Sequence, residues 1–215
     1  MPTSSATTAD HCVRTWFFVD DIDHQYADFV EGRNAVFDAQ RLTPDTHFIA
    51  STGIGGRTAN ATARVMMDAY AVQGLQPGQV AHLYAPDHLN RTSDYGVRFE
   101  RGTTVDYADR RQAFISGTAS IDNQGRVVAP GDIRLQTQRM WQNVQALLAE
   151  AGMDFGHVAQ LLVYLRDPSD YAVVSRLFAR RFPATPHVIL WAPVCRPGWL
   201  IEMECIAVKA TDTDA

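Results

Sequence analysis

The chain has 215 residues, of which 46% are hydrophobic and 20% charged, and this composition is typical of a globular protein with a sizeable core. Its formal net charge of −5 is spread along the chain without a basic stripe, which argues against nucleic acid as a partner. The three cysteines have no CxxC spacing and favour neither a disulfide framework nor a zinc site, so a reducing cytoplasm fits them best. The first residues do not resemble a signal peptide, and no apolar run is long enough for a membrane span. We therefore expect a cytoplasmic protein with no membrane partner.

The first part of the chain alternates between strand patterns and a helical one. Runs of aromatic and β-branched residues predict strands at 12–19, 47–52 and 63–72. Between the first two, apolar residues recur at helical spacing from Ile22 to about Leu42, and Asp21 is suited to cap that helix. The sequence GIGGR, which follows the second strand, is expected to form a tight turn.

The later part of the chain returns to the same order of elements and adds a front part. Strands are predicted at 157–165, 187–193 and 199–208, with a short amphipathic helix after the first of them. The front part has two strand-like stretches, FERGTTVDY and RRQAFISGTAS, a hairpin turn at DNQG, and a long helix from about Ile133 to Ala151. The last strands of the two parts end alike, as MMDAYAV and EMECIAV, and this indicates a weak internal repeat.

These patterns predict an α+β protein built from two units. Residues 1–78 form a partial first unit of order β-α-β-β, and residues 79–215 form a complete unit with two helices packed on one face of its β-sheet. The first unit lacks the front strands and the long helix of the second. We therefore expect open sheet edges and an uncovered core face there.

The last predicted strand, WLIEMECIAV, carries two charges inside an apolar run. Strand alternation places Glu202 and Glu204 on one face and the apolar residues between them on the other. Two carboxyls this close repel, so one is expected to hold a proton or to find a cationic partner. A carboxyl that holds its proton is a candidate general acid. The alternative is that both glutamates form structural ion pairs with arginines.

Several longer stretches carry a family resemblance. They are FISGTASIDNQGRVV, QTQRMWQNVQALLAEAGMDFGHVAQLLVYLRD, RFPATP and IEMECIAV. Together they make residues 93–209 similar to the Rid (YjgF-like) superfamily. The strings VRTWFF, ASTGIGGR, YGVRFERGTTVDYADRR and APVCRPGWLIEMECIAV more specifically resemble the chorismatases, which look like two Rid-type units in one chain. The resemblance implies a Rid-like (chorismate-mutase-like) fold in a relative whose first unit is shortened at its N-terminus.

The resemblance to the chorismatases also implies an activity. It is hydrolysis of the enol ether of chorismate, a small dicarboxylate, to pyruvate and a dihydroxycyclohexadiene carboxylate or a hydroxybenzoate. Such cleavage needs an acid that protonates the terminal methylene carbon, and Glu202 falls where the acid of the family lies. Water then adds to the oxocarbenium ion, so the resemblance implies neither a metal nor an organic cofactor.

Charge and the same resemblance suggest the other site residues. Chorismate is a dianion and guanidinium groups bind carboxylates bidentately, which makes Arg196 and Arg14 candidates for substrate binding, with Arg57 behind them. Cys195 and Ala108 occupy the two positions that steer the product in the family. Ala108 resembles the diene-forming type and Cys195 the aromatising type, so the nature of the product stays open.

Two other functions stay open. One is a Rid-type deaminase of imines or enamines, which is disfavoured because His187 stands where those enzymes carry a carboxylate-binding arginine. The other is a truncated, non-catalytic homologue that binds a small carboxylate. The first unit has Met66 and Asp68 where the second has Glu202 and Glu204, so we expect at most one acid site in the chain.

The oligomeric state is also an expectation. Rid-like units bury the apolar second face of their sheets by trimerising or by pairing within one chain. We therefore expect a trimer-like homo-oligomer, with the site at the junction of two units.

Overall fold

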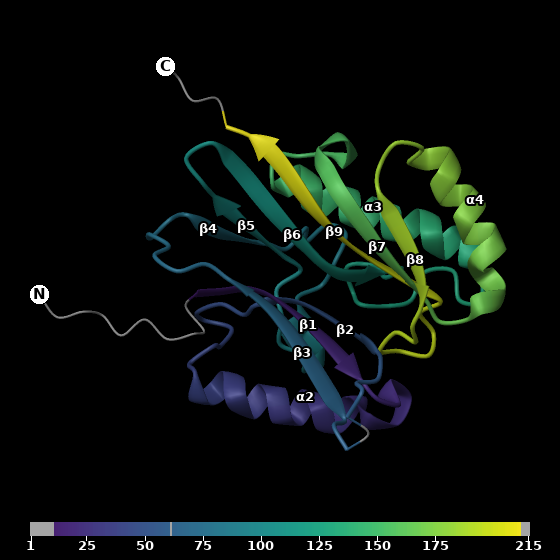
Figure 1. Cartoon of the computed structure of the whole chain (residues 1–215), viewed down its shortest axis with the longest axis horizontal. Coiled ribbons are helices and arrows are strands. Elements are labelled where there is room, and N and C mark those ends of the chain that lie inside the picture. Colours follow the sequence, from purple (N-terminus) through teal and green to yellow (C-terminus); the bar gives the residue numbers. More distant parts are fainter. Residues whose placement is uncertain (1–10, 61, 212–215) are drawn as a thin grey trace, which may run out of the picture.

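The computed structural model describes residues 11–60 and 62–211, which form two β-sheets with helices on their outer faces (Figure 1). The smaller sheet has the strand order β2-β1-β3 and consists of β1 (Cys12–Val19), β2 (Ala50–Gly55) and β3 (Val65–Ala71). The larger sheet has the order β4-β5-β6-β9-β7-β8. Its strands are β4 (Val80–Leu83), β5 (Gly102–Asp106), β6 (Arg110–Ala119), β7 (Val158–Leu165), β8 (His187–Trp191) and β9 (Ile201–Ala210). The predicted α+β class is confirmed.

Two helices cover one face of the larger sheet, as predicted. α3 (Ile133–Glu150) begins where the Asp132 carboxylate accepts hydrogen bonds from two backbone N–H groups of the first turn, and it ends before Gly152, whose φ of 72° suits glycine. α4 (Tyr171–Arg181) lies beside it (Figure 1). The apolar stripes of both helices pack on the sheet in the main core of the molecule.

The smaller sheet carries the remaining described helix, α2 (Ile22–Ala39). β1 and β2 are parallel and flank α2 in the sequence, whereas β3 pairs antiparallel with β1. Asp21 occupies the predicted N-cap position of α2, but it adopts a left-handed conformation and its side chain makes no capping hydrogen bond. Its carboxylate lies 2.9 Å from the ring of His24 instead.

The glycine-rich sequence GIGGR does not form the predicted turn. β2 extends from Ala50 to Gly55, so most of this sequence lies in a strand. Gly55 donates a backbone hydrogen bond of 2.7 Å to Pro193, and a Cβ at Gly55 would lie only 3.0 Å from the ring of that proline. Glycine here permits a close approach between two backbones, which composition alone does not distinguish from a turn. The short edge strand β4 is also absent from the sequence-based expectation.

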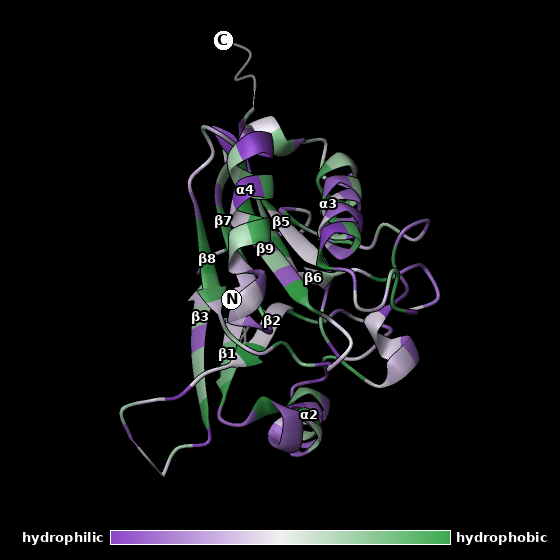
Figure 2. Cartoon of the chain, turned by 90° about the vertical axis from the view of Figure 1, so that its right-hand side faces the viewer, coloured by the Kyte–Doolittle hydropathy of each residue, from purple (hydrophilic) through white to green (hydrophobic). Residues whose placement is uncertain are grey.

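The smaller sheet packs on the face of the larger sheet that α3 and α4 leave free (Figure 2). Two hydrogen bonds of 2.9 and 2.8 Å join β2 to β6, one from the Ser51 N–H to the Ser116 hydroxyl and one from the Gly117 N–H to the Thr52 hydroxyl. The second face of the larger sheet is thus partly buried within the chain. β3 remains exposed along its whole length, in line with the expected open edge.

An apolar groove runs between α2 and the outer face of the smaller sheet. It is lined by Phe17, Phe37, Met67 and neighbouring residues, and the exposed side chain of Val36 lies at its margin. The larger sheet has two helices at the corresponding place, whereas one described helix covers the smaller sheet. None of the described helices is both long enough and apolar enough to cross a membrane.

A stacked histidine pair lies at one end of the contact between the sheets. The rings of His47 and His82 are 5.1 Å apart and nearly parallel. Burial, with His47 and Arg91 nearby, lowers the pKa of His82 to about 4. The unfolded chain takes up this proton near pH 6.5, so the parent protein loses stability as the pH falls from about 6.5 through about 4.

We expect His82→Gln to remove part of this acid sensitivity. The loss between pH 7 and pH 4.5 should shrink by about 1–2 kcal/mol, a value reduced for the part of the ring that faces solvent. Urea unfolding midpoints of the parent and the variant at the two pH values test this. An equal loss in both proteins would show that other groups cause the acid sensitivity.

Candidate active site

Glu202 on β9 lines a small, partly enclosed pocket at the junction of the two sheets. The free space inside is about 30 Å³, room for one water molecule. Its walls come from α2 (Tyr26, Phe29, Arg33), β2 (Ser51, Gly53), the segment before β5 (Tyr95, Phe99, Arg101), β6 (Gly117, Ala119) and the segment before β9 (Cys195, Trp199). Residues from both parts of the chain therefore surround one carboxyl group.

The alternation predicted for β9 is present. Ile201, Met203 and Cys205 belong to the main core on the side of the helices. Glu202 and Glu204 face the smaller sheet and are both at least 95% buried. The two carboxyls have separate environments, and this separation decides what each does.

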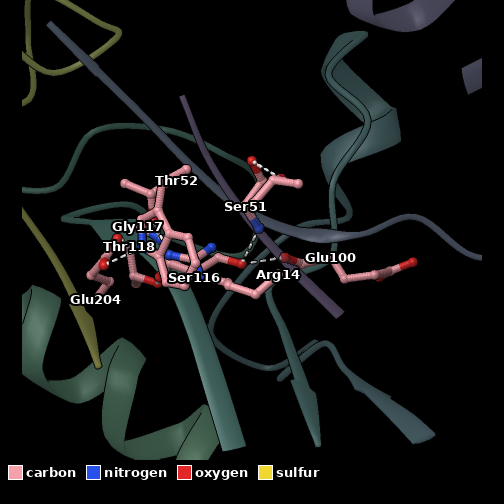
Figure 3. A network of polar contacts seen from close by, with 10 residues as sticks. Arg14, Ser51, Thr52, Glu100, Ser116, Gly117, Thr118 and Glu204 are labelled. Carbon is pink, nitrogen blue, oxygen red and sulfur yellow. Dashed lines mark hydrogen bonds and ion pairs between the residues drawn. The ribbon is translucent and has the colours of Figure 1, made fainter. Parts of the chain in front are cut away.

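Glu204 is held by two donors from β1 (Figure 3). Arg14 Nη2 lies 2.8 Å from Glu204 Oε2, and Trp16 Nε1 donates to Glu204 Oε1 at 2.6 Å. The same Arg14 nitrogen also donates to the hydroxyl of Thr52, while Arg14 Nη1 has no partner among the described residues. Arg14 therefore lies behind the pocket, bound to a glutamate, and does not line it.

Among the described residues, no cation lies at hydrogen-bonding distance from Glu202. Burial and the neighbouring charge of Glu204 raise its pKa to about 8, and the more distant Arg101 and Arg14 oppose this rise. Glu202 is therefore largely protonated at neutral pH. A buried carboxyl that keeps its proton is suited to donate it to a bound molecule.

Several polar donors at the pocket have no partner among the described residues. They are Arg33 Nε and Nη2, the Tyr95 hydroxyl and Trp199 Nε1. Buried donors without partners are costly, and they are usual where a ligand or water completes the site. Arg101 adds a second buried guanidinium, held by the backbone and side-chain oxygens of Asn90 at 3.0–3.2 Å. This set of donors fits an anionic ligand with several oxygen acceptors.

Of the residues expected at the site, Cys195 lines the pocket together with Glu202. Burial raises the pKa of Cys195 to about 12, so its side chain is a neutral thiol. Arg196 lies outside, in an adjoining open cavity, with its guanidinium over the rings of Tyr95 and Trp199 at 5.3 and 5.9 Å. These two rings separate that cavity from the pocket.

The structure does not bring the other two expected residues to the pocket. Arg57 is exposed beyond the end of β2 and pairs with Asp20 at 2.6 Å. Ala108 lies in the turn between β5 and β6, where its carbonyl accepts a hydrogen bond from Thr211. The family resemblance predicts both residues at the site, but both lie beyond the ends of strands and away from the pocket. His187 also lies outside, at the start of β8.

Sequence reasoning missed the donors of the pocket. Arg33 lies on α2, and helical periodicity alone does not reveal that it lines the same pocket as Glu202 on β9. Arg101 and Tyr95 lie in a quoted string, YGVRFERGTTVDYADRR, but nothing in their spacing marks them as neighbours of Glu202. Gly117 in FISGTAS lies against Glu202 so closely that a Cβ there would be 1.9 Å from Oε1.

We expect Gly117→Ala to displace the Glu202 carboxyl, because the added methyl group occupies its position. A shift of about 1 Å in a reacting group costs about 10²-fold in rate. The test compares the rates of substrate turnover by the Gly117→Ala and Gly32→Ala variants. Gly32 is the control, because it lies outside the pocket and a Cβ added there meets nothing within 4 Å. Full activity in a folded Gly117→Ala protein would contradict the position given to the carboxyl.

Comparisons with known proteins show the family to which the chain belongs. A family model described as Endoribonuclease L-PSP matches residues 103–209. A RutC family protein of Pyrococcus abyssi is 35% identical over 98 residues, which cover 45% of this chain and 77% of that relative. The chain belongs to the Rid (YjgF-like) superfamily.

Solved structures extend the likeness of this Rid-family chain to both sheets. A chorismatase crystal structure superposes with a TM-score of 0.79 at 26% identity, over 93% of this chain. The chain spans 65% of the length of that chorismatase. A protein of Entamoeba histolytica described as a putative endoribonuclease L-PSP has 21% identity and a TM-score of 0.51, and it matches 60% of this chain. The second likeness shows the fold alone.

Proposed function

We propose that the chain is a hydrolase of the chorismatase type, which cleaves the enol ether of chorismate or of a closely related dicarboxylate. The products are pyruvate and a cyclic hydroxy acid. The observation that carries this proposal is the buried carboxyl of Glu202, whose pKa is raised to about 8, in a small pocket with buried donors that have no partner among the described residues. The similarity to a chorismatase over 93% of the chain supports the same activity.

Glu202 acts as the general acid in this proposal. It donates its proton to the terminal methylene carbon of the enol ether, which leaves an oxocarbenium ion and a carboxylate on Glu202. A water molecule adds to that ion, and the hemiketal that forms collapses to pyruvate and the ring hydroxyl. The proton released by the water restores Glu202, so no other reagent is consumed.

The substrate is a dianion, and the donors of the pocket match its carboxylates. Arg33 and Arg101 supply two guanidinium groups, and the Tyr95 hydroxyl and Trp199 Nε1 supply single donors. Because the free space is about 30 Å³, a ring of this size enters only when part of the wall moves. Tyr95 and Trp199 line both the pocket and the open cavity beside Arg196, so they are the part of the wall whose movement would join the two spaces.

Membership of the superfamily is equally compatible with a Rid-type deaminase of imines or enamines. The buried, unpartnered Arg33 is the observation that favours it, because one guanidinium is enough to hold the carboxylate of an imino acid. His187, which stands at the position of the family's arginine in sequence, lies outside the pocket and does not supply this contact.

One assay separates the two activities. The purified chain is incubated with chorismate and, in parallel, with a freshly generated imino acid, and pyruvate and ammonia are measured. We expect pyruvate from chorismate and no ammonia above the spontaneous rate. Accelerated ammonia release with no loss of chorismate would replace the proposed hydrolase by the deaminase.

A further inference from the structure

The first sheet supplies a fixed counter-charge beside the proposed acid. Arg14 and Trp16 are two positions apart on β1, so both side chains lie on the same face of the strand, and both reach Glu204 on β9. They bind the two oxygens of Glu204 separately, at 2.8 and 2.6 Å; Arg14 and Glu204 are buried, and Trp16 is partly buried. A guanidinium and an indole N–H on its two oxygens hold the Glu204 carboxylate in one orientation.

Glu202 lies two residues along the same strand and on the same face. Positions two residues apart on a strand are separated by about 6–7 Å, so the charge of Glu204 acts on Glu202 over a short distance, and both side chains are buried. Arg14 is also connected to β6, the neighbour of β9. The Thr52 hydroxyl accepts a hydrogen bond from Arg14 and another, of 2.8 Å, from the Gly117 N–H on β6. Glu204, Arg14, Thr52 and Gly117 thus belong to one connected set of contacts (Figure 3), and Gly117 lies directly against Glu202.

We propose that Glu204, fixed by Arg14 and Trp16, is a positioning residue whose negative charge keeps the carboxyl of Glu202 protonated. In this arrangement residues of β1, in the first part of the chain, fix the charge that acts on Glu202 of β9, in the second part. The use of this proton in catalysis rests on the proposed function, whereas the effect of the Glu204 charge on the Glu202 carboxyl does not.

Other charged or titratable groups also face Glu202 and have to be separated from this effect. Arg101, before β5, and Arg14 on β1 lower its pKa. Cys195 and Tyr164, on the segment before β9 and on β7, are neutral at the pH values of interest, because burial raises the pKa of both thiol and phenol. Glu204 is therefore the one negatively charged neighbour identified for Glu202 within the described residues, and burial acts beside it.

The test is a carboxyl titration that uses no substrate. The ¹³C signal of the Glu202 carboxyl is followed with pH in protein labelled at its glutamates, and Glu202→Gln assigns the signal. In Glu204→Gln we expect the titration midpoint of Glu202 to fall by at least about one pH unit from its value in the parent. The control is Glu100→Gln, which neutralises a buried glutamate that binds the Phe48 N–H outside the pocket and should leave the midpoint unchanged.

Glu204→Gln leaves Arg14 buried beside a neutral side chain and is expected to be destabilised. The double variant Arg14→Gln with Glu204→Gln removes both charges and keeps their volume, and it should show a fall in the same direction. An unchanged midpoint in either folded variant would overturn the proposal and leave burial as the cause. Because no turnover is measured, a fall in the midpoint supports the coupling even if chorismate is not the substrate.

Discussion

Glu202→Gln is expected to reduce pyruvate release from chorismate by about 10²- to 10⁴-fold, the contribution typical of a general acid. Glutamine has nearly the same shape as a protonated glutamate, so the pocket keeps its form while the proton to be donated is lost. Substrate binding should change little, because the donors that bind the carboxylates belong to other residues. Initial rates over a range of chorismate concentrations separate the two effects.

The Glu202→Gln variant should also differ from the parent in how its stability depends on pH, and this test does not require turnover. The pKa of Glu202 is about 8 in the folded protein and near its ordinary value in the unfolded chain, so the parent loses stability as the pH rises from about 4.5 to 8. Glu202→Gln lacks this loss and should unfold at a higher temperature than the parent at pH 8. Undiminished turnover in a stable variant would exclude Glu202 as the acid.

Arg33→Met is expected to lower kcat/KM for the dicarboxylate by about 10²-fold. It removes two unpartnered donors and a charge from the pocket, and hydrogen bonds to a charged group contribute about 1.5–3 kcal/mol each. Methionine keeps the length of the side chain against Phe29 and Phe37, whose rings lie near the guanidinium. Stability should rise at the same time, because a buried cation without a partner is lost.

Arg134→Met, on the exposed side of α3 and outside the pocket, is the matched control for this change. It should alter neither kcat/KM nor the melting temperature appreciably. Loss of activity together with a gain in stability is the pattern of a ligand-binding donor. A stable Arg33→Met protein with unchanged kcat/KM would show that Arg33 does not contact the substrate.

The position of both glutamates on one face of β9 could be predicted from the sequence, because it depends only on neighbouring residues of a single strand. Alternation along WLIEMECIAV placed the two glutamates on one face, and their proximity predicted that one finds a cation or keeps a proton. In the structure each does one of these: Glu204 pairs with Arg14, and Glu202 keeps its proton. Spacing alone did not indicate which glutamate had which role.

The rest of the site depends on contacts between distant parts of the chain. Arg33 on α2 and Arg101 before β5 meet Glu202 because two sheets pack face to face, and no short sequence pattern encodes that approach. Arg57 and Ala108 were chosen from strings that do contain strand residues, but they lie where the chain leaves the sheets. For the same reason the composition of GIGGR predicts a turn that is not present: Gly55 permits a contact with Pro193, which is remote in sequence.

The most direct test of the account is to follow chorismate and pyruvate together in water enriched in ¹⁸O, with Glu202→Gln beside the parent. We predict one pyruvate for each chorismate consumed, with no ¹⁸O in the cyclic product, because water adds to the enol-ether carbon and the ring keeps its oxygen. The parent should show this turnover and the variant should lose most of it. A well-folded parent that consumes no chorismate, or a cyclic product that carries ¹⁸O, would contradict acid-catalysed cleavage of the enol ether.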